Sequence, residues 1–537
     1  MTTPSPEPTD PPGPADLSLG AFSDHPPWLV TPEAMTWQRH LDLVRGATHR
    51  EVPELIEPSR VPPVGRMVRV VLRLGAAVGL WAGGARRKGG SASKADLSRR
   101  LRVAAEHLGP TYIKLGQIIS SGRGLFPDEL VDEFEKCRDQ VPAEPFWVVR
   151  EMVERELGGP LEATFERFDR EPIAAASIAQ VHGARLRSGE EVVVKVQRPS
   201  VGHLVHHDLR VMAWLAPLFV GRIPITALAN PPALVELFAE TIIEELDFRL
   251  EAENMLDVAR SLAELGERRY VVPRPHPHLV TRRMLVMERL SGFAYDDLES
   301  MVAAGIDTHD VLRTGMVGFM EGAMFHGVFH GDLHGGNLLV QPDGRTALLD
   351  FGITGRLSEP RRQAFLRLLV CGTMNDVRGQ LAALRDLGAL PADTDLDDMI
   401  VELELDRPPV DPTTLEAHEL VEELQRVLKA LLGYGARMPK ELMLFVKNMV
   451  FLDSAIATLA PDIDLLAEVA DIATYFAATH GERIAAEAGM RIDSDWEMDM
   501  DAMKAGWGLD DSIERLSYRD LQARRDLIRS RLSHRKG

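Results

Sequence analysis

The chain has 537 residues, more than one hydrophobic core usually supports, so we expect two or more packed units. Apolar residues make up 45% and charged residues 26%, which is ordinary for a folded soluble protein. The net charge of −20 argues against general nucleic-acid binding. The two cysteines, Cys137 and Cys371, are too few for a disulfide framework, which indicates a reducing compartment.

The amino-terminal sequence "MTTPSPEPTDPPGPADLSLG" is rich in proline and lacks the basic and apolar regions of a signal peptide, so residues 1–35 are predicted to form a disordered tail. No stretch reaches the roughly 18 to 20 apolar residues that cross a bilayer; the nearest runs from Leu74 to Ala85. We therefore expect a cytoplasmic protein without a clear transmembrane helix.

A basic segment follows the tail. Between Arg60 and Arg102 there are eleven basic residues and one acid, Asp96, so this segment carries about +10. The sequence "RMVRVVLRLGAAVGLWAGGARRK", from Arg66 to Lys88, has the basic flanks and apolar body of a helix that lies in a membrane interface. The alternative is a helix that packs on its own domain with its arginines in solvent.

Helical patterns continue to Leu157, and the pattern changes to strands near Phe165. The stretch "FERFDREPIAAASIAQVHGARLRSGEEVVVKVQRP" predicts two or three antiparallel strands, with a turn at "RSGEE". Helical patterns return from Val201 to Leu265, and "HLVTRRMLVMERLSG" predicts another pair of strands. Beyond Tyr295 we expect helices, apart from one short strand pair.

That strand pair lies in "HGDLHGGNLLVQPDGRTALLDFG", from His330 to Gly352. Asn337 follows Asp332 by five positions, and Asp350 opens an Asp-Phe-Gly sequence at the end of an apolar strand. A kinase-like site needs a catalytic-loop aspartate, an asparagine five residues later and an Asp-Phe-Gly aspartate, in this order. Magnesium prefers hard oxygen ligands, so Asn337 and Asp350 are the predicted metal ligands.

Two other interpretations of this motif are open. His330 and His334 have the i, i+4 spacing of a metal-binding pair, but the stretch is predicted to be a loop and no zincin glutamate lies between them. A turn with accidental aspartates would explain "DFG" alone, but it does not explain the full spacing.

A kinase-like site also needs a strand lysine paired with a helical glutamate. The strand "EEVVVKVQRP" provides Lys195, and one of the acids on the following helix should be its partner: Glu244, Glu245, Asp247, Glu251 or Glu253. The loop before this strand has Ala174, Ala175, Ala176 and Ser177 where kinases have glycines. Alanine restricts the backbone conformations open to glycine, so we expect this loop to hold phosphates differently.

The sequence at this point resembles the UbiB/AarF family of atypical protein-kinase-like proteins. The resemblance covers roughly Ala105 to Leu357 and depends on five blocks in order: "KLGQ", "AAASIAQVH", "VVVKVQRP", "EELDFRLEAEN" and "HGDLHGGNLL…LLDFG". It implies an α+β, two-lobed protein-kinase-like fold with helical extensions at both ends. The expected units are a helical extension over 36–160, an N-lobe with a helical insert over 161–290, a C-lobe over 291–400 and a helical extension over 401–537.

The resemblance also implies roles for individual residues. Lys195 would contact the nucleotide phosphates and pair with Glu251, and Asp332 would be the catalytic aspartate. The Ala174–Ser177 loop would bind ATP, and "MERL", ending in Glu288, Arg289 and Leu290, would be the hinge that binds adenine. Lys114, Gly116 and Gln117 match a Lys-x-Gly-Gln motif that packs over the site, and Gly116 would let its helix approach another backbone. Lys114 would meet Glu245 and Asp247, the Glu-x-Asp pair.

These assignments predict a magnesium-dependent ATPase or small-molecule kinase at a membrane surface. By resemblance, it would support isoprenoid quinone or related lipid biosynthesis or transport, with ATP and Mg²⁺, a membrane lipid or quinone precursor, and a biosynthetic enzyme complex as partners. The alternative is a nucleotide-gated scaffold that binds lipid or enzymes without required turnover. No Ala-Pro-Glu sequence follows the Asp-Phe-Gly, so protein phosphorylation is disfavoured.

Overall fold

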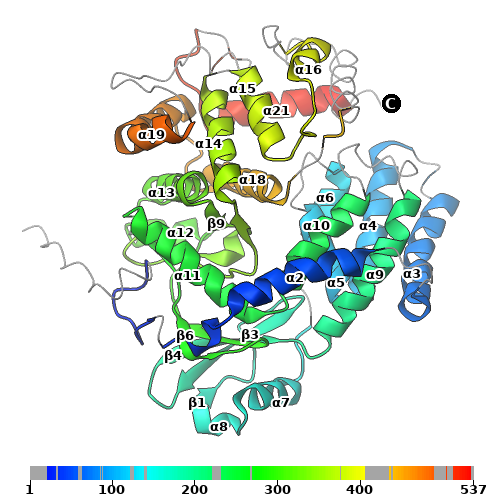
Figure 1. Cartoon of the computed structure of the whole chain (residues 1–537), viewed down its shortest axis with the longest axis vertical. Helices are drawn as coiled ribbons and strands as arrows, with labels where there is room; N and C mark the ends of the chain where they lie inside the picture. Colours follow the sequence, from blue (N-terminus) through cyan, green and yellow to red (C-terminus); the bar gives the residue numbers. More distant parts are fainter. Residues whose placement is uncertain are drawn as a thin grey trace, which may run out of the picture.

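The structure is a computed structural model with a part built on a six-stranded sheet, here called the N-lobe, and a mainly helical part, here called the C-lobe (Figure 1). The described residues are 21–31, 34–57, 63–84, 86, 89–120, 126–137, 142–219, 231–266, 269–374, 376–405, 434–436, 439–488, 504, 509 and 512–533. Most of the predicted amino-terminal tail, and part of the basic segment with Arg60, Arg87 and Lys88, lie outside them.

The N-lobe is a six-stranded sheet in the order β1-β3-β4-β7-β6, with β2 paired to β3. Its strands are β1 (Phe165–Phe168), β2 (Ala174–Ala175), β3 (Ala179–Leu186), β4 (Glu191–Gln197), β6 (Pro275–Val280) and β7 (Met284–Glu288). Val192, Val194 and Val196 alternate along β4 and are buried in one core cluster, as expected for a β-branched strand. The alternation places Lys195 on the opposite face of the sheet.

The predicted turn between Arg187 and Glu190 joins β3 to β4. Gly189 has a φ of 108°, a conformation that glycine adopts without strain, and its N–H donates to Leu186 O at 2.9 Å. The sequence predicted two or three strands in this region, and the structure has four, because β1 and the two-residue β2 both pair with β3.

Three helices are inserted between β4 and β6: α9 (Val201–Phe219), α10 (Pro231–Glu244) and α11 (Phe248–Glu264). Asp247 ends the short link before α11 and caps this helix, since its side chain accepts a hydrogen bond from Arg249 N. The capped first turn of α11 carries Glu251, whose side chain is buried. The insert therefore positions an acidic residue against the sheet.

The amino-terminal helices pack around α9 and α10 and form a second hydrophobic core with them (Figure 1). The elements before the sheet are η1 (Thr36–Gln38), α2 (Leu41–Ile56), α3 (Val64–Gly83), α4 (Gly90–Leu108), α5 (Pro110–Ser120), α6 (Asp128–Glu135), α7 (Phe146–Leu157) and α8 (Leu161–Thr164). α7 packs instead beneath the N-lobe sheet. Cys137 and Cys371 are both free and buried.

The C-lobe contains two small sheets, the helices α12 and α13, and two short helical segments, η3 and η4. The sheets are β5-β11-β10-β8 and β12-β9. The elements are β5 (Tyr270–Val271), β8 (Phe293–Ala294), α12 (Leu298–Ala303), α13 (Thr308–Glu321), η3 (Gly322–His326), β9 (Val328–His330), η4 (Gly335–Asn337), β10 (Leu338–Val340), β11 (Thr346–Leu348) and β12 (Thr354–Arg356).

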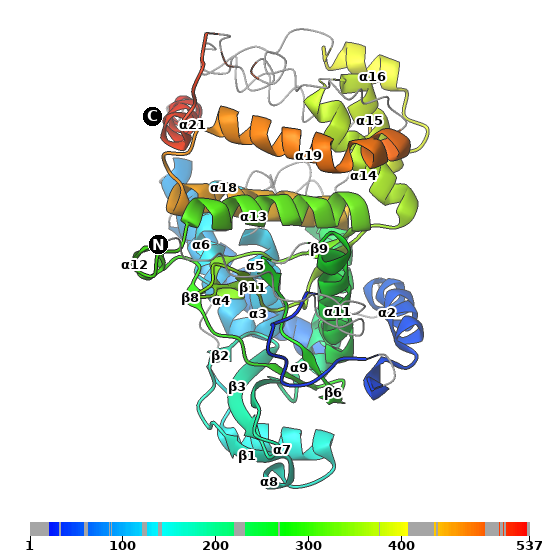
Figure 2. The ribbon, with the colours of Figure 1, turned by 90° about the vertical axis from the view of Figure 1, so that its left-hand side faces the viewer.

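The carboxy-terminal helices form the upper layer of the molecule, with α19 above α13 and α18 (Figure 2). They are α14 (Glu359–Thr373), α15 (Val377–Asp386), α16 (Leu396–Glu402), α18 (Lys440–Leu459), α19 (Leu465–Ala488) and α21 (Tyr518–Ser533). α18 packs beside α13, where Phe445 stacks on Phe319 with ring centroids 5.2 Å apart. The C-lobe therefore shares one hydrophobic core with α14, α18, α19 and the start of α21, whereas α16 packs with part of α15 in a smaller, separate cluster.

α18 is the one helix among the described residues that is long and apolar enough to cross a membrane by length and composition alone. It has 20 residues, including Lys447 and Asp453, and an 18-residue window within it has a mean hydropathy of 1.6. Its buried side chains include Leu444, Phe445 and Leu452, which pack in the shared core. We interpret α18 as a core helix of the folded protein, because a buried core helix can be as long and as apolar as a helix that crosses a membrane.

Candidate active site

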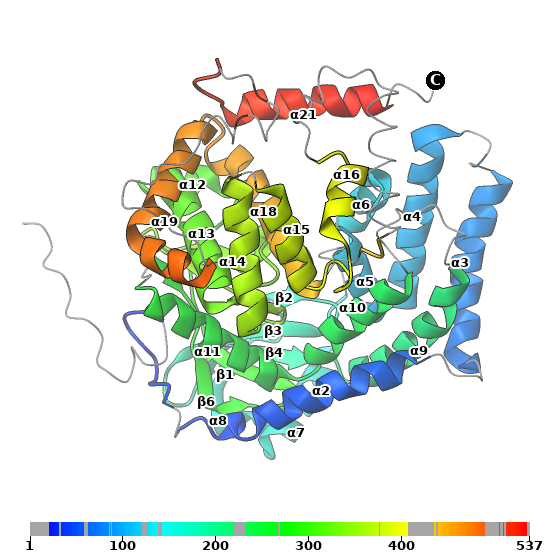
Figure 3. The same ribbon diagram turned by 45° about the horizontal axis from the view of Figure 1, so that its top comes forward.

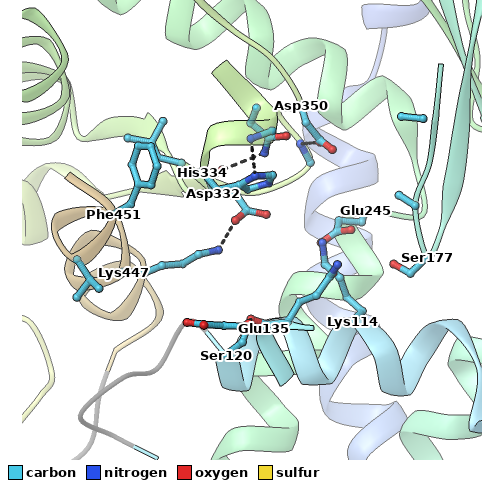
Figure 4. Close-up of a pocket in the computed structure, with 18 of the residues that line it drawn as sticks. Lys114, Ser120, Glu135, Ser177, Glu245, Asp332, His334, Asp350, Lys447 and Phe451 are labelled. Atoms are coloured by element: carbon cyan, nitrogen blue, oxygen red, sulfur yellow. Dashed lines mark hydrogen bonds and ion pairs between the residues drawn. The ribbon is translucent and has the colours of Figure 1, made fainter. Parts of the chain in front are cut away.

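A cavity of about 960 Å³ lies between the N-lobe sheet, α5 and α18. Its lining comes from six regions of the chain: the loop after β2, β4, the insert, the stretch from β9 to β11, α5 with the end of α6, and the carboxy-terminal helices α18 and α21. Figure 4 shows Lys114, Asp332, Asp350 and Lys447 around this cavity. The candidate site therefore includes side chains from nearly the whole length of the described chain.

Lys195 is held between two carboxylates on the cavity side of the sheet. Its Nζ atom lies 2.7 Å from Glu251 Oε1 and 3.0 Å from Asp350 Oδ1. Burial opposes the charge on Lys195, but the two acids prevail and raise its pKa. Burial also raises the pKa of Glu251, against the effect of Lys195. The structure thus shows the predicted pair of Lys195 and Glu251.

Asp350 follows β11 in a left-handed backbone conformation with φ of 52°. Non-glycine residues seldom adopt this conformation, and where they do it is common at functional sites. Oδ1 accepts a hydrogen bond from Gly352 N at 3.1 Å, and Asn254 Nδ2 donates to Phe351 O at 2.9 Å. Burial opposes ionisation, yet Lys195 and Lys114 lower the pKa of Asp350, so its carboxylate is charged.

The loop from β9 to η4 is fixed by its own hydrogen bonds. Asp332 N donates to His330 Nδ1 at 3.2 Å, and this assigns Nε2 as the donor to Leu349 O at 2.9 Å. Burial lowers the pKa of His330, which keeps the ring neutral. Asn337 Nδ2 donates to Asp332 O at 3.0 Å. His330 is therefore a structural residue of the loop.

The histidine metal site receives no support from these contacts. Both ring nitrogens of His330 are engaged, and His334 Nδ1 accepts from Gly336 N at 3.1 Å. Within the described ranges, no group of three or more His, Cys, Asp and Glu side chains could hold a metal ion.

The oxygens of Asn337 and Asp350 fit magnesium better. Since the amide nitrogen of Asn337 donates to the Asp332 carbonyl, its side-chain oxygen is the atom left to bind a metal. The half-exposed Asp350 carboxylate and Asn337 both line the cavity. Two hard oxygen ligands beside a cavity of nucleotide size suit a Mg²⁺ that is held mainly by phosphates and water.

Lys114 and Gln117 on α5 also line the cavity. Lys114 Nζ lies 2.8 Å from Glu245 Oε1, and both side chains are largely buried. The second acid of the predicted Glu-x-Asp pair is placed differently from the prediction. Asp247 caps α11 and binds the Arg249 guanidinium, with 2.6 Å between Oδ2 and Nη2, so it lies outside the cavity lining.

Gly116 approaches a side chain rather than another backbone, which corrects the prediction for this position. A Cβ atom built on Gly116 would lie 2.3 Å from Cδ1 of Phe134, on α6. Any larger residue would therefore displace the Phe134 ring and separate α5 from α6. Glycine at this position allows the two helices to pack closely.

The alanine-rich loop lies along the cavity, with Ala174, Ala175, Ala176 and Ser177 in its lining. Ala176 N donates to Ala179 O at 2.8 Å, and Arg198 Nε donates to Ala176 O at 3.1 Å. These two bonds close the loop into a tight turn that is tied to the chain beyond β4. The loop is therefore held by its own contacts and by Arg198.

The predicted hinge residues Glu288 and Leu290 are not among the residues that line the cavity. The Glu288 side chain is buried behind the sheet, where it accepts hydrogen bonds from Ser23 Oγ and Arg274 N. Glu288 N is also engaged, since it donates to Arg274 O at 2.9 Å. The structure therefore does not bring these two side chains to the other predicted nucleotide residues.

The contribution of the carboxy-terminal helices to the cavity lining was not predicted from the sequence. Lys447 on α18 donates a hydrogen bond to Asp332 Oδ1 (Figure 4), and Arg525 on α21 lines the same cavity and lies 2.6 Å from Asp453. Lys447 and Lys114 lower the pKa of Asp332 despite its burial. A lone lysine inside the apolar sequence "ELMLFVKNMVFL" is the signal that could have indicated Lys447.

Comparison with known proteins shows the family to which the chain belongs. The family model of the ABC1 atypical kinase-like domain matches residues 136–383. An uncharacterized Mycobacterium tuberculosis protein is 34% identical over 84% of this chain and 92% of its own length. An uncharacterized chloroplastic aarF domain-containing protein kinase from Arabidopsis thaliana is 33% identical over 68% and 72%, respectively. A protein named "Probable protein kinase UbiB" from Aliivibrio fischeri is 32% identical over 69% of each chain.

Among solved structures, an erythromycin complex of the Mycobacterium tuberculosis protein Rv3197 covers 61% of this chain and 89% of its own, with 21% identity and a TM-score of 0.35. The sequence relatives define a kinase-like protein. The chain belongs to the UbiB/AarF family of ABC1 atypical kinase-like proteins, as the motifs predicted.

Proposed function

We propose that this protein binds Mg-ATP in the cavity and transfers its γ-phosphoryl group to water or a small hydroxyl compound. The observation that carries the proposal is the convergence of Lys195, Asp332, Asn337 and Asp350 on one cavity. These side chains come from β4, the loop after β9 and the end of β11, and they occupy the order that kinase-like chemistry requires. This proposed activity is more specific than the kinase-like family to which the chain belongs.

Each residue has a proposed task in this reaction. Lys195, oriented by Glu251, holds the nucleotide phosphates. Asp332 orients the attacking hydroxyl or water, and Asn337 and Asp350 would bind the metal. A Mg²⁺ ion held by Asn337 and Asp350 would supply charge neutralisation to the phosphates.

The position of α5 supports a small acceptor. Lys114 pairs with Glu245 at one side of the cavity, and Gln117 and Glu135 at the end of α6 also line the cavity. A folded protein substrate would have to displace these helices to reach Asp332. We therefore propose a small-molecule acceptor and, from the family resemblance, a role in isoprenoid quinone or related lipid biosynthesis or transport.

Attachment to a membrane surface is supported by α3, which lies at the outer edge of the molecule (Figure 1 and Figure 3). Val70 and Ala77 face the protein, whereas Leu72 is 67% and Leu80 is 64% exposed. Arg69 and Arg73 are also exposed. Exposed apolar side chains beside arginines suit an anionic lipid surface.

Not every arginine of the basic segment is available to lipid. Arg66 turns inward, where its Nε donates to the buried Asp208 at 2.6 Å and its guanidinium also donates to Leu108 O. α3 therefore combines both predicted possibilities: one face packs on the domain, and the opposite face is open to a membrane.

The proposal is tested by ATP binding to the purified protein, measured calorimetrically with and without Mg²⁺. Wild type should bind ATP more tightly with Mg²⁺, and Lys195→Met should weaken binding at least about tenfold because one charge-assisted phosphate contact is lost. Lys94→Met, on α4 and outside the cavity lining, is the matched control. Equal ATP affinity in the wild type and the Lys195→Met variant would contradict the proposed site.

A further inference from the structure

Two adjacent residues of α18 hold the loop that contains Asp332. Asn448 is fully buried, its Oδ1 accepts a hydrogen bond from Leu333 N at 2.9 Å, and its Nδ2 donates to His330 O. Lys447 donates to the Asp332 carboxylate itself. α18 lies beyond residues 136–383, the part of the chain that the family model matches.

The two contacts fix different parts of Asp332. Asn448 bridges the backbone before and after this residue, so it sets the path of the loop. Lys447 engages only Oδ1 of the side chain, and its ammonium is largely shielded from water, with 15% of the side chain exposed. Oδ2 is then the oxygen that remains to bind an acceptor hydroxyl group.

We propose that Lys447 is a positioning residue for phosphoryl transfer, which holds the Asp332 carboxylate in the orientation that binds the acceptor hydroxyl group. The inference rests on the proposed function. In the reaction, the hydroxyl oxygen forms a bond to the γ-phosphorus and the bond from that phosphorus to the β–γ bridging oxygen breaks. ADP leaves with the bonding electrons, and the hydroxyl proton leaves by way of Asp332 Oδ2.

Orientation has a large effect on a step of this kind. A carboxylate that rotates freely samples many directions, and the reaction needs the acceptor oxygen close to and in line with the phosphorus. The side chain of Lys447 also lines the cavity, and a cation near developing negative charge is most effective where water is excluded. The loop "HGDLHGGN" itself contains no lysine or arginine.

The other chemically reasonable role for Lys447 is neutralisation of a buried acid for stability alone. The two roles predict different kinetics. A stabilising pair would affect the amount of folded enzyme, whereas a positioning residue affects kcat of the folded enzyme with little change in KM for ATP. Recovery of kcat in Lys447→Arg further distinguishes the two roles, since arginine can also donate to Asp332 and keeps the positive charge.

The experiment measures phosphate release from Mg-ATP by wild type, Lys447→Met and Lys447→Arg, with the folded fraction determined for each. We expect Lys447→Met to lower kcat at least about tenfold and to leave KM for ATP within about threefold, and Lys447→Arg to recover most of the loss. Lys440→Met is the matched control: Lys440 lies on the same helix, pairs with Glu244 at 3.3 Å and is outside the cavity lining. Its kcat should equal that of wild type.

If Lys447→Met does not fold, Lys447→Gln replaces it, because glutamine is polar but uncharged and one atom shorter than lysine, so it should not hold the Asp332 carboxylate in the same way; a similar loss of kcat is expected. Wild-type kcat in either variant, or no recovery in Lys447→Arg, would overturn this inference and leave the proposed function standing. No phosphate release by wild type would overturn the proposed function, and this inference with it.

Discussion

Lys114 on α5 and Glu245, directly after α10, lie 2.8 Å apart on one side of the cavity (Figure 4). The contact is a largely buried ion pair. It joins the amino-terminal helices to the insert, and both residues line the cavity. Breaking a buried pair on one side leaves an uncompensated charge.

Lys114→Met should therefore destabilise the protein by about 3 to 5 kcal/mol, and Lys114→Met with Glu245→Gln should recover most of that loss. Denaturant unfolding of the four proteins of this cycle measures the coupling. Lys136→Met is the control, because the Lys136 side chain is 59% exposed and its pair with Glu133 should contribute less than about 1 kcal/mol. An equal loss of unfolding free energy in Lys114→Met and Lys136→Met would show that the buried pair contributes no more to stability than the control pair.

Asp332→Asn distinguishes an enzyme from a nucleotide-gated scaffold. The change removes the charge that orients the acceptor, so turnover should fall by at least about a hundredfold while ATP affinity stays within a fewfold of wild type. Complementation of a deletion strain by the Asp332→Asn variant then measures whether biological function is retained. Loss of both turnover and complementation fits an enzyme, whereas full complementation by a variant that binds ATP without turnover would establish the scaffold.

His276 on β6 should make stability depend on pH. Its ring lies beside Trp28 and its Nδ1 accepts from His278 N and Leu279 N. Burial, with a smaller effect of His278, lowers the pKa of His276 to about 4. The unfolded chain therefore binds a proton near pH 6.5 that the folded protein does not, and folding stability declines as the pH falls from 6.5 to 4.

His276→Asn tests this dependence, because an amide oxygen can accept the same backbone hydrogen bonds but takes up no proton. Between pH 7 and pH 5, wild type should lose about 2 kcal/mol more unfolding free energy than the variant. Urea unfolding at the two pH values gives the difference. Parallel losses in both proteins would show that His276 is not the responsible group.

The exposed face of α3 should determine binding to anionic liposomes. Substitution of both Leu72 and Leu80 by glutamine removes apolar area without touching the inward Arg66, so folding should persist and liposome binding should fall at least about tenfold. Deletion of the segment would be less informative, because Arg66 binds the buried Asp208. Val401→Gln, at an equally exposed apolar position on α16, should bind liposomes as wild type does.

The sequence predicted the residues whose positions are set by local structure. Lys195 lies on a β-branched strand, where the alternation of side chains decides which face of the sheet it occupies. The motif from Asp332 to Asp350 has a fixed spacing, which leaves few possible backbone paths between the two aspartates. The pairs of Lys195 with Glu251 and of Lys114 with Glu245 followed from the family resemblance. The structure now shows both contacts.

Other features depend on tertiary packing that periodicity does not describe. Lys447 is 115 residues from Asp332 in sequence. The sequence around Lys447 predicts only an apolar helix of the core and does not indicate which loop that helix contacts. Asp247 lies two positions from Glu245, yet it caps the next helix. Gly116 faces the Phe134 ring, a contact that depends on how α5 and α6 meet. The buried position of Glu288 depends on Ser23, from a segment more than 250 residues earlier.

The most direct test of the proposed phosphoryl transfer is phosphate release from Mg-ATP by the purified protein, with and without anionic liposomes, against Asp350→Asn. We expect turnover in wild type that liposomes increase, and turnover at least about a hundredfold lower in Asp350→Asn, because the variant loses a proposed metal ligand. Tight ATP binding without phosphate release in wild type, or equal release in the variant, would contradict the proposed function.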